Sequence, residues 1–215
     1  MNQQVVTSSH STLGMRYLLH VPPSYRQDSD ERWPLILYLH DATERGSNID
    51  LVKTSGIASV VEEQRDLPFI TVSPQCPEGS WWPLHLDAID ALMKEVRNLY
   101  QIDERRIYLT GYGMGGYGVW NMATTFPDRF AAIAPVSGGG DPEAVCALTD
   151  VPVWVFHGER DNVVLIREAR KMVDALRMCG GKVRFTIYPN GGHDVWIRAY
   201  NNPRLYEWFL SHKKP

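Results

Sequence analysis

Three positions in the second half of the chain could together carry nucleophilic catalysis, but one of them lacks the side chain that this chemistry needs. Asp161 follows a strand-like run, and His193 lies in the glycine-containing segment 191–194. A carboxylate bonded to one nitrogen of an imidazole fixes its tautomer, so that the other nitrogen can take a proton from a hydroxyl or a water. The third position is the centre of Gly111-Tyr112-Gly113-Met114-Gly115, which has G-x-S-x-G spacing but a glycine where the serine should stand.

The segment around Gly113 has the local context of a nucleophile elbow, a sharp turn between a strand and a helix. Ile107–Thr110 is rich in β-branched and aromatic residues and predicts the strand, and Met114–Phe126 predicts the helix. Glycines flank such a turn because a Cβ there would clash with the strained backbone and its neighbours. The turn chemistry is therefore present, whereas the attacking hydroxyl is absent.

Strand-like and helix-like segments alternate along the chain, which predicts a mostly parallel sheet with helices on both faces. The expected strands are 4–9, 15–21, 35–39, 69–73, 107–110, 131–136, 151–156 and 183–188. The expected helices are 57–64, 87–100, 114–126, 163–178 and 203–211. The first two strands should form an antiparallel edge hairpin with a turn at 11–14. One α/β domain over residues 1–215 is the economical interpretation.

Loops at the carboxyl ends of parallel strands share one rim of the sheet, and ligands bind there. The rim should include 40–46, 75–82, 111–116, 157–162 and 190–194. Gly113, Asp161 and His193 are thus expected to lie close together, although they are far apart in sequence.

Composition excludes several classes of function. The chain of 215 residues is 44% hydrophobic and 22% charged with net charge −3, and it has no basic run, so we expect no nucleic-acid partner. No apolar run approaches the roughly 18 residues of a membrane span. The amino-terminal residues show no leader pattern, which favours a cytoplasmic protein, or a secreted one if a leader was removed. No H-x-x-x-H or carboxylate-rich loop indicates a metal, and no cofactor is expected.

The cysteines are Cys76, Cys146 and Cys179, three widely spaced residues. An odd number without C-x-x-C spacing argues against a disulfide framework or a zinc site. We therefore expect three reduced thiols, at least some of them in the core.

Several motifs together resemble a known family. They are Leu37–His40 with Glu44–Gly46, Pro74–Pro77, Thr110–Gly111 with Met114–Gly116, Pro127–Phe130, His157–Gly158 with Asp161, and Gly192–Asp194. In these motifs the chain resembles the small, lidless carboxylesterases of the α/β-hydrolase superfamily. That group is related to feruloyl esterases, dienelactone hydrolases and polyhydroxybutyrate-depolymerase-like enzymes. The resemblance runs from about Tyr17 to about Ser211 and implies an α/β-hydrolase fold.

The resemblance also implies roles for particular residues. Asp161 would be the triad acid and His193 the triad base. The backbone N–H of Met114 would be one oxyanion donor, with a second from the loop after His40, which contains Asp41 and Ala42. The chain departs from the family at two places: Gly113 replaces the serine, and Asp41 and Thr43 stand in a loop that is usually glycine-rich.

These departures leave three explanations open. The chain is a natural esterase homologue that lost or altered its chemistry, or an active esterase whose serine was replaced to trap a ligand, or a scaffold for another reaction. In the third case His193 activates a water beside Gly113, and Asp41 acts as a second carboxylate or as a nucleophile. A non-catalytic module that binds a small molecule in the same pocket is the opposing class.

Other candidate residues have both a structural and a functional interpretation. Trp81 and Trp82 form either core packing or a wall for an apolar or aromatic acyl group. Tyr112 either packs or presents its hydroxyl at the site, and His40 and His157 are expected to be structural. The expected ligand is a small-molecule ester or carboxylate, and the sequence carries no signal for an oligomeric state.

Overall fold

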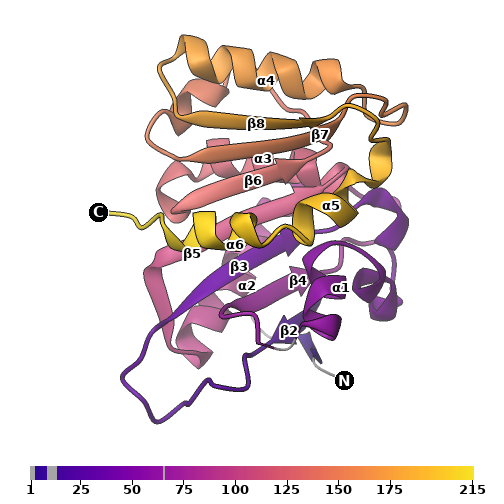
Figure 1. Ribbon diagram of the computed structural model, residues 1–215. Helices are drawn as coiled ribbons and strands as arrows, with labels where there is room; N and C mark the ends of the chain where they lie inside the picture. The colour runs from indigo at the N-terminus through magenta and orange to yellow at the C-terminus, as the bar shows by residue number, and fades with distance from the viewer. Residues whose placement is uncertain (1–2, 9–13, 65) are drawn as a thin grey trace.

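The computed structural model describes residues 3–8, 14–64 and 66–215, which include an eight-stranded sheet in the order β1-β2-β4-β3-β5-β6-β7-β8 (Figure 1). The strands are β1 Gln4–Thr7, β2 Arg16–His20, β3 Trp33–Leu39, β4 Ile70–Pro74, β5 Ile102–Tyr112, β6 Ala132–Val136, β7 Val153–Gly158 and β8 Val183–Tyr188. The α-helices are α1 Gly56–Glu63, α2 Leu86–Leu99, α3 Met114–Thr125, α4 Ile166–Met178, α5 Trp196–Tyr200 and α6 Pro203–Leu210. Short 3₁₀ turns are η1 Ala42–Glu44, η2 Ile49–Thr54, η3 Trp82–His85, η4 Pro127–Arg129, η5 Val145–Leu148 and η6 His193–Val195.

The pairing of the strands confirms the predicted mostly parallel sheet with an antiparallel start. Strands β4, β3, β5, β6, β7 and β8 pair in parallel. Strand β2 runs antiparallel to both β1 and β4. The turn predicted at 11–14 lies almost wholly outside the described residues.

Helices cover both faces of the sheet, because successive strand side chains point to opposite sides. In β3, Leu35 and Leu37 pack into a core with α2, α3 and α4. The intervening Ile36 and Tyr38 pack into a second core with α1, α5 and α6. Figure 1 shows α1, α5 and α6 in front of the strands, with α2 and α3 behind them. The three-layer arrangement holds the strand ends, and therefore the loops after them, in fixed positions.

The start of one helix differs from the prediction for an identifiable reason. Helix α4 begins at Ile166 rather than at 163, because the backbone N–H groups of Val163 and Val164 bond the Asp161 carboxylate instead of starting the helix. Two glycines cap the carboxyl end of α4: Gly180 N–H bonds Arg177 O at 2.9 Å and Gly181 N–H bonds Leu176 O at 2.9 Å. Helix α5 lies in a segment for which the sequence predicted no element.

The expectation of three reduced thiols is wrong for two of the cysteines. Cys146 and Cys179 form a disulfide with 5.5 Å between their Cα atoms, while Cys76 is free and buried. The bridge joins η5 to the carboxyl end of α4, segments that are 33 residues apart in sequence. Their spacing gave no signal because only the packing of α4 onto the sheet brings them together.

No α-helix among the described residues is long and apolar enough to span a membrane.

Candidate active site

The turn between β5 and α3, where the sequence predicts a nucleophile elbow, is a sharp strand-to-helix turn at Gly113. Gly113 has φ 55° and ψ −115°, and its N–H donates to Val136 O at 3.0 Å. The flanking glycines are required by close backbone approach: a Cβ on Gly111 would lie 2.7 Å from Leu39 O, and one on Gly115 would overlap the same carbonyl. The glycine spacing seen in the sequence is therefore a packing requirement between α3 and β3.

His193 lies beside this turn and is oriented by Asp161, as the chain order predicted. His193 Nδ1 is 2.8 Å from Asp161 Oδ2, and Asp161 Oδ1 accepts the N–H groups of Val163 at 3.0 Å and Val164 at 2.9 Å. Burial raises the pKa of Asp161, but the hydrogen bonds from His193 and Val164 outweigh it, so the net pKa is lowered. The carboxylate thus stays ionised and holds the ring with Nε2 toward the elbow.

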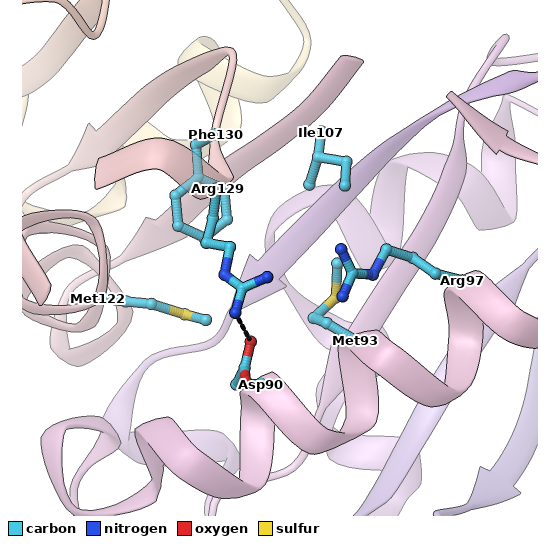
Figure 2. A pocket seen from close by; sticks show the side chains of 7 residues that line it. All are labelled: Asp90, Met93, Arg97, Ile107, Met122, Arg129 and Phe130. Atoms are coloured by element: carbon cyan, nitrogen blue, oxygen red, sulfur yellow. Dashed lines mark ion pairs between the residues drawn. The ribbon is translucent and has the colours of Figure 1, made fainter. Parts of the chain in front are cut away.

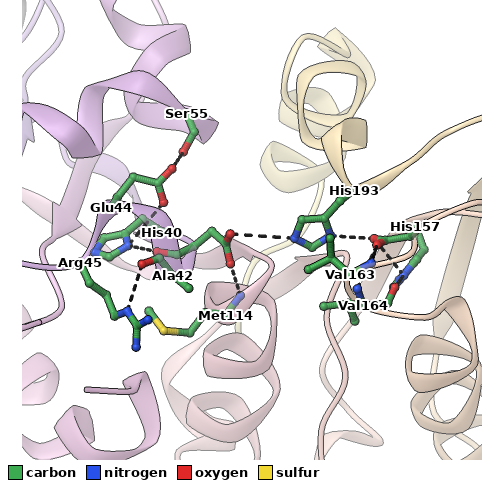
Figure 3. Close-up of polar contacts among 12 residues, drawn as sticks. His40, Ala42, Glu44, Arg45, Ser55, Met114, His157, Val163, Val164 and His193 are labelled. Atoms are coloured by element: carbon green, nitrogen blue, oxygen red, sulfur yellow. Dashed lines mark hydrogen bonds and ion pairs between the residues drawn. The ribbon is translucent and has the colours of Figure 1, made fainter. Parts of the chain in front are cut away.

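Asp41 occupies the space that a side chain on residue 113 would fill. A Cβ built on Gly113 would lie 2.6 Å from Asp41 Cγ, closer still to Oδ1, and 3.1 Å from His193 Nε2. Asp41 Oδ1 accepts the backbone N–H of Met114 at 2.7 Å. Asp41 Oδ2 lies 3.9 Å from His193 Nε2, on the line of contacts that Figure 3 draws between Met114 and His193. The Asp41 carboxylate therefore occupies Met114 N–H, the donor expected to bind an oxyanion, and it faces the His193 imidazole.

His40 holds the backbone of Asp41 in this position. Its Nδ1–H donates to Asp41 O at 2.6 Å, and its Nε2 accepts Cys76 N–H at 2.9 Å. Burial lowers the pKa of His40 to about 4, so the ring is neutral near pH 7 and can donate at one nitrogen and accept at the other. The expected structural role of His40 thus includes placing a carboxylate at the site, which sequence reasoning missed.

The two adjacent tryptophans differ in environment. Trp82 is fully buried, and its indole N–H donates to His40 O at 2.8 Å, so it packs under the site and lines no accessible wall. Trp81 is 53% exposed and lies 5.5 Å below the Arg45 guanidinium. Arg45 also donates to Ala42 O and Ser80 O, each at 3.0 Å. It thereby ties the loop after β3 to the loop that carries Trp81.

Two further side chains surround the aspartate–histidine pair. The Tyr112 ring packs 4.9 Å from the His193 ring, and burial with the nearby carboxylates raises the pKa of its hydroxyl. His157 Nε2 bonds Val164 O at 2.8 Å and lies 3.5 Å from Asp161 Oδ2. Burial lowers the pKa of His157, so this ring is a neutral support for the loop that carries Asp161.

The cavity in Figure 2 is unrelated to these residues. It lies between α2 and the segment around Phe130, against Ile107 of β5, and Asp90 and Arg129 pair there at 3.3 Å. Its volume of about 20 Å³ admits little more than one water. Among residues 3–8, 14–64 and 66–215, no group of three or more His, Cys, Asp or Glu side chains could hold a metal ion.

A mostly parallel sheet with a sharp glycine turn after β5, and with an aspartate–histidine pair at the strand ends, is the arrangement of the α/β-hydrolase class. Residues 80–202, more than half of the chain, match the dienelactone hydrolase family. The chain belongs to this family.

Two similar proteins have esterase in their names. The chain is 28% identical over 149 residues to a bifunctional acetylxylan esterase/xylanase of Neocallimastix patriciarum, covering 65% of this chain and 21% of that protein. It is 26% identical over 173 residues to a probable feruloyl esterase C of Aspergillus niger, covering 73% of this chain and 62% of that protein.

Solved structures agree on the fold. A thermostable esterase superposes with a TM-score of 0.82 and 35% identity, covering 99% of this chain and 64% of that chain. S-formylglutathione hydrolase from Staphylococcus aureus superposes with a TM-score of 0.75 at 17% identity, covering 97% and 96%. The chain spans less than two thirds of the length of the two relatives and of the thermostable esterase.

Proposed function

We propose that this chain is a carboxylic-ester hydrolase homologue that keeps the esterase fold and the Asp161–His193 pair but does not form an acyl-enzyme at a serine. The observation that carries this proposal is the place of Asp41, whose Oδ1 accepts Met114 N–H at 2.7 Å. Serine at 113 and a substrate oxyanion on Met114 N–H would each need space that the carboxylate fills. Ordinary serine esterase activity is therefore weak or absent in this form.

Two physical reasons support the loss of ordinary ester hydrolysis. Gly113 has no hydroxyl, so no acyl-enzyme can form there. A carboxylate on the oxyanion donor also opposes the negative charge that develops when an ester carbonyl is attacked. In other serine hydrolases, the residual catalysis without the triad is only about 10³–10⁴-fold over water.

The remaining residues have proposed roles that follow from their positions. His193 is the base and Asp161 orients it, while Met114 and the backbone of Ala42 are the donors near the reacting group. Trp81, which is 53% exposed, is the wall for an apolar or aromatic part of a small ester or carboxylate ligand.

One observation favours a second candidate, a reaction in which His193 activates a water. His193 Nε2 is buried and has no hydrogen-bond partner among the described residues, although Nδ1 is held by Asp161. An oriented and unengaged imidazole nitrogen is suited to act as a general base. A pure binding module has no need of such a nitrogen.

The test uses an activated short-chain aryl ester and a fluorophosphonate that reacts with activated serines. We expect the chain to remain unlabelled and its ester turnover to equal that of His193→Ala. The proposal is wrong if the chain is labelled stoichiometrically at a serine, or if its ester turnover exceeds that variant by a factor typical of an intact triad, about 10³ or more. Turnover of the ester that depends on His193 without any label supports the water-activating candidate. Absence of turnover with a small molecule retained in purification supports the binding module.

A further inference from the structure

We infer that Asp41 is itself a nucleophile, and that the chain hydrolyses small uncharged alkyl substrates with a leaving group such as bromide through an Asp41 alkyl ester. The inference rests on the proposed function, because it requires that no serine acts at position 113. It assigns a reaction to the carboxylate that replaces the serine.

The position of Asp41 provides the first argument. Its Oδ1 lies where a side chain on residue 113 would begin, and Met114 N–H holds that oxygen at 2.7 Å. Its Oδ2 has no such donor among the described contacts and faces His193 Nε2 at 3.9 Å. One oxygen is therefore anchored, and the other is available for attack.

The chemistry of carboxylates selects the kind of substrate. Attack of a carboxylate on an ester carbonyl would give an anhydride, which is more reactive than the ester and forms unfavourably. Attack on a saturated carbon gives an ester, a stable covalent intermediate of the kind that aspartate nucleophiles form. A halide leaves without a proton, so the first step needs no general acid.

The two steps balance with water as the co-reactant. Asp41 Oδ2 forms a bond to the saturated carbon, and the carbon–bromine bond breaks with its electron pair leaving on bromide. His193 Nε2 then takes a proton from a water whose oxygen attacks Asp41 Cγ. The bond from Cγ to the alkyl oxygen breaks, the departing alkoxide takes the proton from His193, and the alcohol leaves. The aspartate ionises and releases one proton, so bromoalkane and water give alcohol, bromide and a proton.

The second step is the hydrolysis of an ester, and the groups around Asp41 are placed to assist it. The ester carbonyl oxygen at Oδ1 remains on Met114 N–H, which stabilises the tetrahedral oxyanion. The imidazole that activates the water is held by Asp161 at 2.8 Å. The side chains of Asp41 and His193 are 13% and 15% exposed, so the pair lies close to the protein surface.

The experiment follows bromide release from a series of primary bromides, bromoethane to bromohexane and benzyl bromide, by the full chain in water labelled with heavy oxygen. Asp41→Asn keeps the shape of the side chain and removes the nucleophile, and we expect it to lower bromide release at least about 10³-fold. Asp150→Asn, a change at an exposed carboxylate, is the matched control and should retain the rate. His193→Gln should accumulate the alkyl ester, detected as the mass of the alkyl group on the peptide that contains Asp41.

The isotope distinguishes this route from direct attack by water. In a single turnover the alcohol should carry ordinary oxygen from Asp41, and Asp41 should gain heavy oxygen. Heavy oxygen in the first alcohol, or bromide release no faster than in folded Asp41→Asn for every bromide tested, overturns the inference. Labelling with the fluorophosphonate separates the two proposals. If the chain is unlabelled and forms no alkyl ester, only the role of Asp41 as nucleophile is refuted. If a serine is labelled, the proposed function is refuted as well.

Discussion

Restoring serine at position 113 should not by itself restore an esterase, because Asp41 and Gly113 share one space. A Cβ on residue 113 would lie 2.6 Å from Asp41 Cγ, so the carboxylate must rotate away in Gly113→Ser. The backbone at φ 55° adds about 1–2 kcal/mol for a residue other than glycine. We therefore expect Gly113→Ser to be less stable than the chain with glycine at this position and only weakly active.

Removing the carboxylate at the same time should release both the serine and the oxyanion donor. Asp41→Gly frees Met114 N–H, which Asp41 now engages at 2.7 Å. Loss of one oxyanion donor costs about 10²–10³ in turnover in other hydrolases. The Asp41→Gly/Gly113→Ser chain should therefore exceed Gly113→Ser by at least about 10²-fold in kcat/KM for an aryl ester. Asp41→Gly alone, with no nucleophile, should remain inactive.

The four chains form a double-mutant cycle in which the two changes are strongly non-additive. The readouts are kcat/KM for an aryl butyrate, labelling of the new serine by fluorophosphonate, and thermal unfolding to show that each chain is folded. Equal activity of Gly113→Ser and the double variant would refute the reasoning, because it would mean that Asp41 does not obstruct the site. An inactive double variant that is folded and unlabelled would show that His193 and its surroundings cannot activate a serine at position 113.

Three further predictions concern stability. Replacing Cys146 and Cys179 by serine should lower the free energy of unfolding by about 2–4 kcal/mol in an oxidising buffer, measured by urea denaturation, with no difference between the chains after reduction. The folded pKa of His40 is about 4 against 6.5 unfolded, so stability present above pH 6.5 is lost as pH falls toward 4. The loss is about 3 kcal/mol, and a folded His40→Gln chain titrated in parallel should show a correspondingly shallower decline. Gly115→Ala places a Cβ on the carbonyl of Leu39 and should cost about 2–4 kcal/mol or prevent folding, and an unchanged melting temperature would contradict the tight packing of α3 on β3.

Much of the fold was predictable because its signals are local. Alternating apolar strands and amphipathic helices predicted the sheet with helices on both faces. The parallel pairing of β4, β3, β5, β6, β7 and β8 places the carboxyl ends of these six strands on one side of the sheet. The glycine pattern at 111–115 predicted a sharp turn because glycine, which has no Cβ, lets backbone segments approach closely. The start of α4 was misjudged because Asp161 diverts the N–H groups of Val163 and Val164, a competition that periodicity does not report.

Other features depend on distances between remote segments. From the sequence alone Trp82 is a candidate wall of the ligand pocket, whereas the structure buries it against His40. The disulfide joins residues 33 apart whose spacing matches no motif. Residue type alone carries neither fact, because both arise from how elements pack across the sheet.

The order of residues along the chain was enough to predict the α/β-hydrolase scaffold, the aspartate–histidine pair and the glycine turn at 111–115, because each is a matter of residue identity and order. Only the folded chain showed which side chain lies beside Gly113. Asp41 is 72 residues before Gly113 in the sequence, yet its carboxylate fills the space beside it, because parallel pairing of β3 with β5 brings the ends of the two strands together.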